Sequence, residues 1–357
     1  MPTPLTPDTE TEARHGRDAA VQLTTLSISA AGGTTFALLG VPGGYLSGAI
    51  LAGAAAALSG AELRVSQSVR NVALTVLGMV VATTITQETL RSLPQWPVSI
   101  LALATAMAAL IVVLPRYFTR MHDIDTPTAR LCAIPGALSL VLALADDLAV
   151  DERRVAVLQS LRLALLMVLV PLAVGLGMDT GDAVQAPAPL LAWSQLSIMV
   201  VFSLAGIVAA RKLGMPAPYL TGPMLLSGTL FATGTFDGRL PEPLVAAAFI
   251  VLGASVGARF AGVDRAYLVN CVGAGAGGIG ISVVLTGMIA WPAAVYLGIP
   301  FIQVWLALAP GGLDTMIALS LATGVDPAFV AGHQFLRLIG LFMIVPFLFR
   351  GARRAQS

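Results

Sequence analysis

The sequence predicts an all-α membrane protein of two inverted repeats, each with about five transmembrane helices plus a re-entrant or broken helix. The first observation behind this prediction is composition. The 357-residue chain is 57% hydrophobic and 11% charged, whereas a soluble domain carries about 25% charged residues. This excludes an ordinary cytosolic enzyme, a disordered chain and a basic nucleic-acid-binding protein. With three His and two Cys, neither a disulfide scaffold nor a metal or other cofactor is expected.

The second observation is the spacing of the charges. The two longest charge-free runs are 19–61 and 266–313. A transmembrane helix needs about 20 mostly apolar residues, so each run has room for two segments. We expect the turns at 40–44 and at Trp291-Pro292. Shorter uncharged runs follow Arg70, Arg130, Arg162 and Glu242.

The third observation is an internal duplication. The frame G-x-P-x-x-Y-L-[ST]-G occurs at Gly40–Gly48 and again at Gly214–Gly222. The stretch Leu131–Pro171 matches Leu306–Pro346, with Pro, Gly, Asp, Gln and Arg shared at equivalent positions. The predicted parts are a disordered cytoplasmic tail (1–19), a first membrane repeat (20–176), a linker loop (177–192), a second membrane repeat (193–350) and a basic cytoplasmic tail (351–357).

Orientation is predicted from Lys and Arg in the short loops, which favour the cytoplasm. The basic loops are 60–70, 115–130, 151–154, 211–217 and 259–266, and the poorly basic loops are 40–44, 88–97, 177–192, 235–243 and 291–295. The two sets alternate only if 131–150 and 296–323 each enter and leave on one side. A Pro-Gly pair in each favours a broken helix. Five crossings then invert the second repeat, whereas twelve crossings in parallel repeats would leave Arg211 and Lys212 outside.

Two arginines stand inside apolar segments at equivalent places, Arg162 and Arg337. A charge at the centre of a membrane helix costs about 2.5–3.5 kcal/mol on insertion scales, so each needs a partner, a water-filled cavity or an anion. Gln159 and Gln334 lie three residues earlier, on the same helix face. The two Gln/Arg pairs either bind solute or serve the structure, by reaching an interface or binding the carbonyl groups of a broken helix.

Asp314 is an acid in a long apolar stretch, and its first-repeat counterpart is Ser139. It is a candidate proton carrier, cation ligand or ion-pair partner of Arg337. Asn270 and His333 are auxiliary candidates, although a lone His is more often structural. The candidate substrate-binding set is Pro135, Gly136, Gln159, Arg162, Pro310, Gly311, Gly312, Asp314, Gln334 and Arg337.

Residues 273–280 contain G-x-G-x-x-G twice. A dinucleotide fingerprint also needs a preceding strand and an acid about 20 residues later. Here the glycines lie in an uncharged membrane run, and position 298 is Gly298. Small residues that let helices pack closely are the favoured interpretation.

The duplicated G-x-P-x-x-Y-L-[ST]-G and P-G-[AG]-L…V-D…V-A-x-x-Q-x-L-R blocks resemble the bacterial AbrB membrane-protein family, which shares only its name with a small DNA-binding regulator. The resemblance covers about 330 residues and implies an integral inner-membrane protein. Members carry the labels ammonia monooxygenase and regulator of gene expression. The family's second block reads P-G-G-L-x-E-M, whereas here the acid stands one position earlier, at Asp314. The first block, Pro135 to Leu140, lacks the acid.

Three functions compete: a secondary transporter, a membrane-bound regulator and a membrane oxidase. Copper-dependent oxidation needs clustered His ligands, and His15, His122 and His333 form no pair by spacing, so no enzyme is expected. Without a DNA-binding module, any regulation would be indirect. We therefore expect a gradient-driven transporter of a small anionic or zwitterionic solute. Its partners would be the bilayer and the solute, with or without a proton, and no nucleic acid; a homo-oligomer is left open. Both termini would be cytoplasmic.

Overall fold

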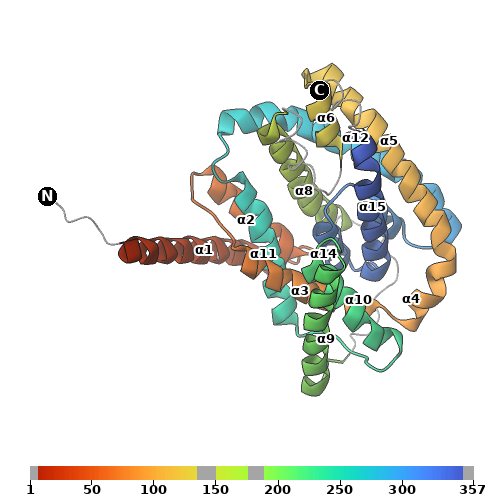
Figure 1. The fold of residues 1–357 in the computed structure, drawn as a ribbon. Helices are drawn as coiled ribbons and strands as arrows, with labels where there is room; N and C mark the ends of the chain where they lie inside the picture. Colours follow the sequence, from red (N-terminus) through yellow and green to blue (C-terminus); the bar gives the residue numbers. More distant parts are fainter. Residues whose placement is uncertain (1–6, 135–149, 176–188, 349–357) are drawn as a thin grey trace.

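The computed structural model describes residues 7–134, 150–175 and 189–348, which form an all-helical fold without a β-strand (Figure 1). The helices described are α1 (Pro7–Leu38), α2 (Gly44–Leu58), α3 (Gln67–Thr84), α4 (Gln87–Ser92), η1 (Leu93–Gln95), α5 (Trp96–His122), α6 (Thr126–Ala133), α8 (Glu152–Gly175), α9 (Trp193–Lys212), α10 (Pro218–Ala232), α11 (Glu242–Gly257), η2 (Ala258–Phe260), α12 (Arg265–Leu297), α13 (Phe301–Leu308), α14 (Leu313–Thr323) and α15 (Pro327–Leu348). The two η elements are short 3₁₀-helices.

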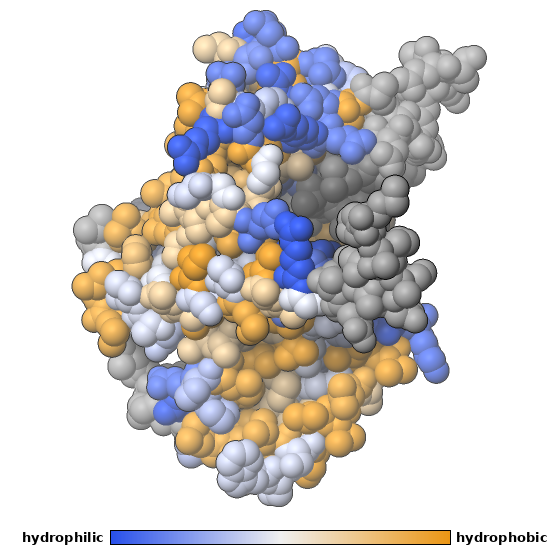
Figure 2. Space-filling view, turned by 90° about the vertical axis from the view of Figure 1, so that its left-hand side faces the viewer, coloured by the Kyte–Doolittle hydropathy of each residue, from blue (hydrophilic) through white to orange (hydrophobic). Residues whose placement is uncertain are grey.

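Within these ranges, five helices are long and apolar enough to cross a membrane. They are α5, α8, α9, α11 together with η2, and α12. Their outer faces carry large apolar side chains, including Val201 and Met288, which are 63% and 69% exposed. Figure 2 shows hydrophobic side chains over much of one face, with hydrophilic side chains gathered at its upper end. The predicted all-α class is confirmed, and these five helices have the length and composition expected of membrane spans.

The first predicted turn is confirmed. α1 ends at Leu38 and α2 begins at Gly44, with left-handed backbone at Gly40 and Gly43 (φ 74° and 63°). Glycine adopts this conformation at little cost because it has no Cβ. The second copy of the motif makes the same turn before α10, although there the left-handed residue next to the helix is Ala217 (φ 49°).

The turn predicted at Trp291-Pro292 is wrong. α12 runs without interruption through Pro292 and ends at Leu297, where Gly298 takes a left-handed conformation (φ 65°). A proline is tolerated inside a membrane helix because neighbouring groups satisfy the freed carbonyl. The stop comes from Gly298 and from Pro300 two residues later, the usual signals of a helix C-terminus.

The predicted disordered tail also needs correction, because α1 begins at Pro7 and residues 7–19 are therefore helical. Glu and Ala in this segment are good helix formers, and the segment is continuous with the apolar remainder of α1. Proline suits the first helical position, where its missing N–H leaves no bond unmade.

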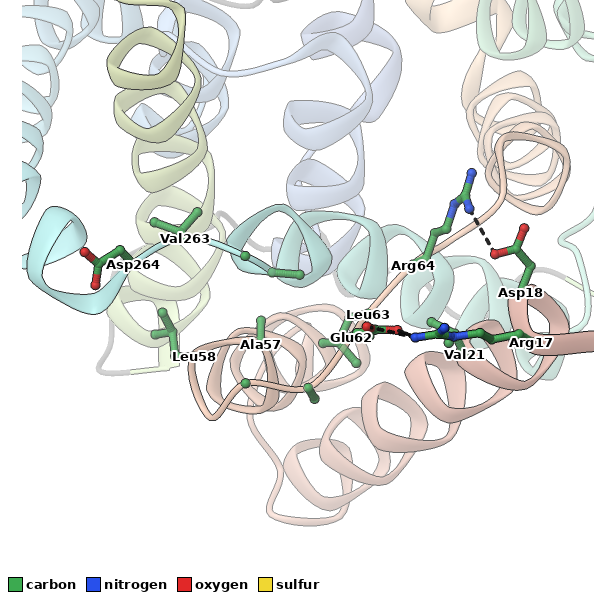
Figure 3. A pocket seen from close by; sticks show the side chains of 14 residues that line it. Arg17, Asp18, Val21, Ala57, Leu58, Glu62, Leu63, Arg64, Val263 and Asp264 are labelled. Atoms are coloured by element: carbon green, nitrogen blue, oxygen red, sulfur yellow. Dashed lines mark hydrogen bonds and ion pairs between the residues drawn. The ribbon is translucent and has the colours of Figure 1, made fainter. Parts of the chain in front are cut away.

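Two exposed ion pairs join this end of α1 to the α2–α3 loop. Arg17 contacts Glu62 and Arg64 contacts Asp18, each at 3.1 Å between nitrogen and oxygen. Figure 3 shows both pairs at the wall of a pocket of about 550 Å³. Exposed pairs of this kind contribute only about 0–1 kcal/mol, so they position the end of α1 more than they stabilise it.

Glycines set the closest helix crossings. α1 meets α2 at Gly32 and Gly48, and α9 meets α10 at Gly206 and Gly222, where an added Cβ would overlap the backbone of the other helix. The glycine run 273–280 lies inside α12 and faces side chains of α5 and α8. These contacts confirm the predicted role of the run in helix packing. A dinucleotide fingerprint would instead require a strand and a loop, whereas this run is helical.

The helix is interrupted between α13 and α14, where residues 309–312 are not helical. Backbone at Ala309 and Gly312 is extended (ψ 141° and 154°), and α14 restarts at Leu313. α6 stops in the same way, since Ile134 is extended with ψ 121°. The predicted helix break at Pro310 is confirmed, whereas the continuation of the first break, 135–149, lies outside the described residues.

Candidate functional site

Gln334 and Arg337 meet the end of α13 from α15. Both side chains are buried, with 0% and 4% of their surface exposed. Gln334 donates from Nε2 to the carbonyl of Leu306 at 2.8 Å, and Arg337 donates from Nη1 to the carbonyl of Ala309 at 2.6 Å. A second guanidinium nitrogen, Nη2 of Arg337, donates to the carbonyl of Gly311.

These bonds satisfy carbonyl groups that the helix break leaves without a partner in the helix. The last carbonyl groups of a helix have no partner within the helix, and an unpaired carbonyl in an apolar interior is costly. Arginine and glutamine supply N–H donors where α13 stops. The positive charge of Arg337 also suits a helix C-terminus, where the aligned peptide dipoles leave about half a negative charge.

The first half of the chain repeats the arrangement on α8. Gln159 and Arg162 are 3% and 6% exposed. Gln159 donates to the carbonyl of Leu131 at 3.2 Å, and Arg162 donates from Nη2 to the carbonyl of Ile134 at 3.4 Å. The sequence separation is 28 residues for both bonds, as it is for Gln334 to Leu306 and for Arg337 to Ala309.

The carbonyl groups do not use every donor of the two arginines. Nε of Arg162, Nε of Arg337 and Oε1 of Gln334 are buried without a hydrogen-bond partner among the described residues. In the part of the chain that the structure describes, no ion pair joins either arginine to a carboxylate. Each buried guanidinium group therefore has backbone carbonyls at a helix end as its hydrogen-bond acceptors.

Comparison with known proteins adds a family. The model of the family described as "Transition state regulatory protein AbrB" matches residues 7–353, nearly the whole chain. The chain belongs to the AbrB family. "Putative regulator AbrB" of Escherichia coli (strain K12) is 28% identical over 329 residues, which cover 88% of this chain and 91% of the relative. "Uncharacterized protein YhjN" of Bacillus subtilis (strain 168) is 24% identical over 359 residues, with 91% of each chain covered.

The AbrB resemblance seen in the sequence motifs is thereby confirmed, and the match includes the ends of both α6 and α13. In this AbrB-family chain, Pro310, Gly311 and Gly312 are buried within the second break. Pro135, Gly136 and Ser139 of the first block lie outside the described residues.

Asp314 has a partner that the sequence interpretation did not consider. Its Oδ2 accepts a bond from Nη2 of Arg70 on α3 at 2.9 Å, and the two side chains are 21% and 30% exposed. The ion pair with Arg337 considered above is therefore wrong. Arg337 bonds to the carbonyls of Ala309 and Gly311, whereas Asp314 lies in the first turn of α14, which packs against α3. The sequence alone indicates no role for Arg70 beyond its place in the basic loop 60–70.

His333 is satisfied by structural contacts. It is completely buried, with Nε2 at 2.7 Å from Oγ of Ser99 on α5 and Nδ1 at 2.8 Å from the carbonyl of Phe329. Its ring lies 5.0 Å from that of Trp96. Asn270 is exposed on α12, so neither auxiliary candidate joins the two Gln/Arg pairs. No group of three His, Cys, Asp or Glu side chains within the described ranges is placed to hold a metal ion.

Proposed function

We propose that this AbrB-family chain is a gradient-driven secondary transporter of a small anionic or zwitterionic solute. It would act in the bacterial inner membrane and would not be an enzyme. One observation carries the proposal: Arg162 and Arg337, two buried arginines, donate hydrogen bonds to backbone carbonyls where α6 and α13 end. Broken helices near the centre of the bilayer form the binding sites of many secondary transporters.

The order of the helices supports two structural repeats. α2 and α10 both have 15 residues, and they begin at 44 and 218. α6 and α13 both have 8 residues, and they begin at 126 and 301. Each repeat in this proposal holds five crossings and one broken helix. Because five is odd, the second repeat would be inverted with respect to the first.

Side chains at the helix ends support the proposed orientation. α9 begins at Trp193, which is 84% exposed, and ends at Lys212. α12 begins at Arg265 and reaches exposed Trp291 and Tyr296 near its end. Exposed Trp and Tyr favour the membrane interface, and basic residues favour the cytoplasmic side. Lys212 and Arg265 would therefore be cytoplasmic, together with both chain termini.

The chemistry of the two arginines suggests the class of solute. A guanidinium group presents N–H donors in a fork that matches a carboxylate or another oxyanion. The buried Nε atoms of Arg162 and Arg337 have no acceptor among the described residues, and both side chains are shielded from water. An anion between the two breaks would supply the counter-charge that the described side chains do not. A zwitterion such as an amino acid would meet the same demand through its carboxylate.

The names of the family and of the Escherichia coli relative favour a second candidate, a membrane-bound protein that affects gene expression. In this proposal such an effect would be indirect and would follow from movement of the solute. The two candidates differ in a measurable way. A transporter moves its solute across a vesicle that contains no other protein, whereas a regulator requires a partner.

The test is a ligand screen on the purified full chain, read out as thermal stabilisation by small carboxylates and amino acids. We expect a ligand that stabilises the wild type, stabilises Arg337→Gln by less than half as much, and acts on Arg120→Gln as on the wild type. Arg337→Lys retains the charge and is expected to recover part of the effect. The stabilising ligand is then tested for uptake into proteoliposomes. Equal stabilisation of wild type and Arg337→Gln would remove Arg337 from the site.

A further inference from the structure

We propose that Arg70 and Arg259 form a second anion-binding site, which the carboxylate of Asp314 occupies in the conformation described here. The site lies where α3, the end of α11 and the start of α14 meet. Its ligands would be small oxyanions, that is, carboxylates or phosphate. The proposal does not require that the chain transports a solute.

The first part of the argument is the state of Arg259. This residue stands in η2, directly after α11, and its Nη1 is buried without a hydrogen-bond partner among the described residues. Arg70, Arg259 and Asp314 line the same small void, so the three charged groups lie close together. A buried guanidinium donor left unpaired is costly. Nη1 of Arg259 is therefore available to donate a hydrogen bond to a bound oxyanion.

The second part is the balance of charge. Arg70 is bound to Asp314 at 2.9 Å, whereas Nη1 of Arg259 has no hydrogen-bond acceptor among the described residues. Two guanidinium groups therefore face one carboxylate. The same carboxylate also accepts the backbone N–H of Thr315 through Oδ1, so Asp314 is held at the start of α14. An oxyanion from solution could bond to both arginines, whereas Asp314 bonds only to Arg70.

The third part is the space between these groups. The void that they line measures about 10 Å³, which is close to the minimum that holds one water molecule. An oxyanion does not fit until the Asp314 side chain moves away. The hydroxyl groups of Ser255 and Thr315 also line the void, and at present they donate to backbone carbonyls of Val251 and Gly312. Asp314 thus acts as a tethered anion that competes with any ligand.

Displacement of Asp314 would reach the helix break. Only two residues, Gly312 and Leu313, separate Asp314 from Gly311, whose carbonyl is bound by Arg337. The segment 311–314 is therefore held by Arg337 at one end and by Arg70 at the other. An anion that replaces Asp314 on Arg70 releases one of these two attachments, and the start of α14 becomes free to move.

The experiment uses inorganic phosphate, with acetate as a second probe, and measures binding to the purified full chain by calorimetry. Asp314→Asn removes the competing charge, and its dissociation constant for at least one probe is expected to be at least tenfold lower than that of the wild type. Arg259→Gln in the Asp314→Asn background is expected to reverse this gain. Arg120→Gln, which removes an exposed positive charge on α5, is the matched control.

Two results would overturn the site: an unchanged affinity in Asp314→Asn, or a gain in affinity that persists after Arg259→Gln. If Asp314→Asn does not fold, the wild type and Arg259→Gln are compared for thermal stabilisation by phosphate at tens of millimolar. Equal stabilisation of the two would refute the proposal. These outcomes are independent of whether Arg337 binds a transported solute, because the solute screen substitutes neither Asp314 nor Arg259.

Discussion

Arg337 donates a hydrogen bond of 2.6 Å to the carbonyl oxygen of Ala309, the residue directly after the end of α13. A second bond from Arg337 reaches Gly311 on the other side of Pro310. One buried side chain therefore satisfies two carbonyls within the break, one on each side of Pro310. The equivalent arginine, Arg162, makes a bond of 3.4 Å to Ile134.

The first prediction compares the two arginines. Arg337→Gln leaves the carbonyls of Ala309 and Gly311 without their donors, and each buried unsatisfied group costs about 1–3 kcal/mol. We expect a loss of about 2–5 kcal/mol in unfolding free energy, on the same principle. Arg162→Gln should cost less, because its one bond to a described residue is longer. Denaturation in detergent measures both, and a larger loss for Arg162→Gln would contradict the prediction.

The second prediction compares Gly222, which is packed against another helix, with Gly280, which has open space beside it. An added Cβ at Gly222 would overlap the backbone of Gly206 on α9, whereas at Gly280 on α12 it would meet nothing within 4 Å. Gly222→Ala should therefore destabilise the α9–α10 crossing. Gly280→Ala should stabilise the chain by about 0.4–1 kcal/mol, because alanine restricts the unfolded state. Thermal unfolding of the two variants checks the order, which a reversed result would contradict.

The third prediction concerns orientation. A single cysteine at Thr235, in an exposed loop between α10 and α11, should react with an impermeant thiol reagent in intact cells. A cysteine at Lys212 should react only after the cells are opened. The background carries Cys132→Ala and Cys271→Ala, which replace two buried native thiols. Labelling of the Lys212 position in intact cells is the result that would exclude the inverted arrangement.

The fourth prediction separates His333 from solute binding. Ser99→Ala removes the hydroxyl that lies 2.7 Å from Nε2 of His333, which links α5 to α15. Loss of this buried bond should lower the unfolding free energy by about 1–3 kcal/mol. The affinity for a ligand found in the screen should stay unchanged. A selective loss of affinity at normal stability would instead assign His333 to the site.

Features that depend on short stretches of chain could be predicted from the sequence. Apolar runs predicted the all-helical membrane class, Pro310-Gly311 predicted the break before α14, and the glycines of α12 predicted close packing. The end of α12 was harder to predict, because proline and glycine both signal helix ends and the segment contains Pro292 and Gly298. Only Gly298 supplies the left-handed backbone that ends α12.

The sequence by itself determined the apolar helices, the duplicated motifs and the pairing of a glutamine with an arginine on one helix face, because periodicity and composition are local properties of a chain. The tertiary structure decided the partners. Asp314 binds Arg70, which is 244 positions away in the sequence, and His333 contacts Ser99, which is 234 positions away. Helix packing alone brings such residues within the roughly 3 Å that a hydrogen bond requires. No local pattern distinguishes Arg70 from Arg337 as the partner of Asp314, since both could compensate its charge and the choice depends on which helix packs against α14.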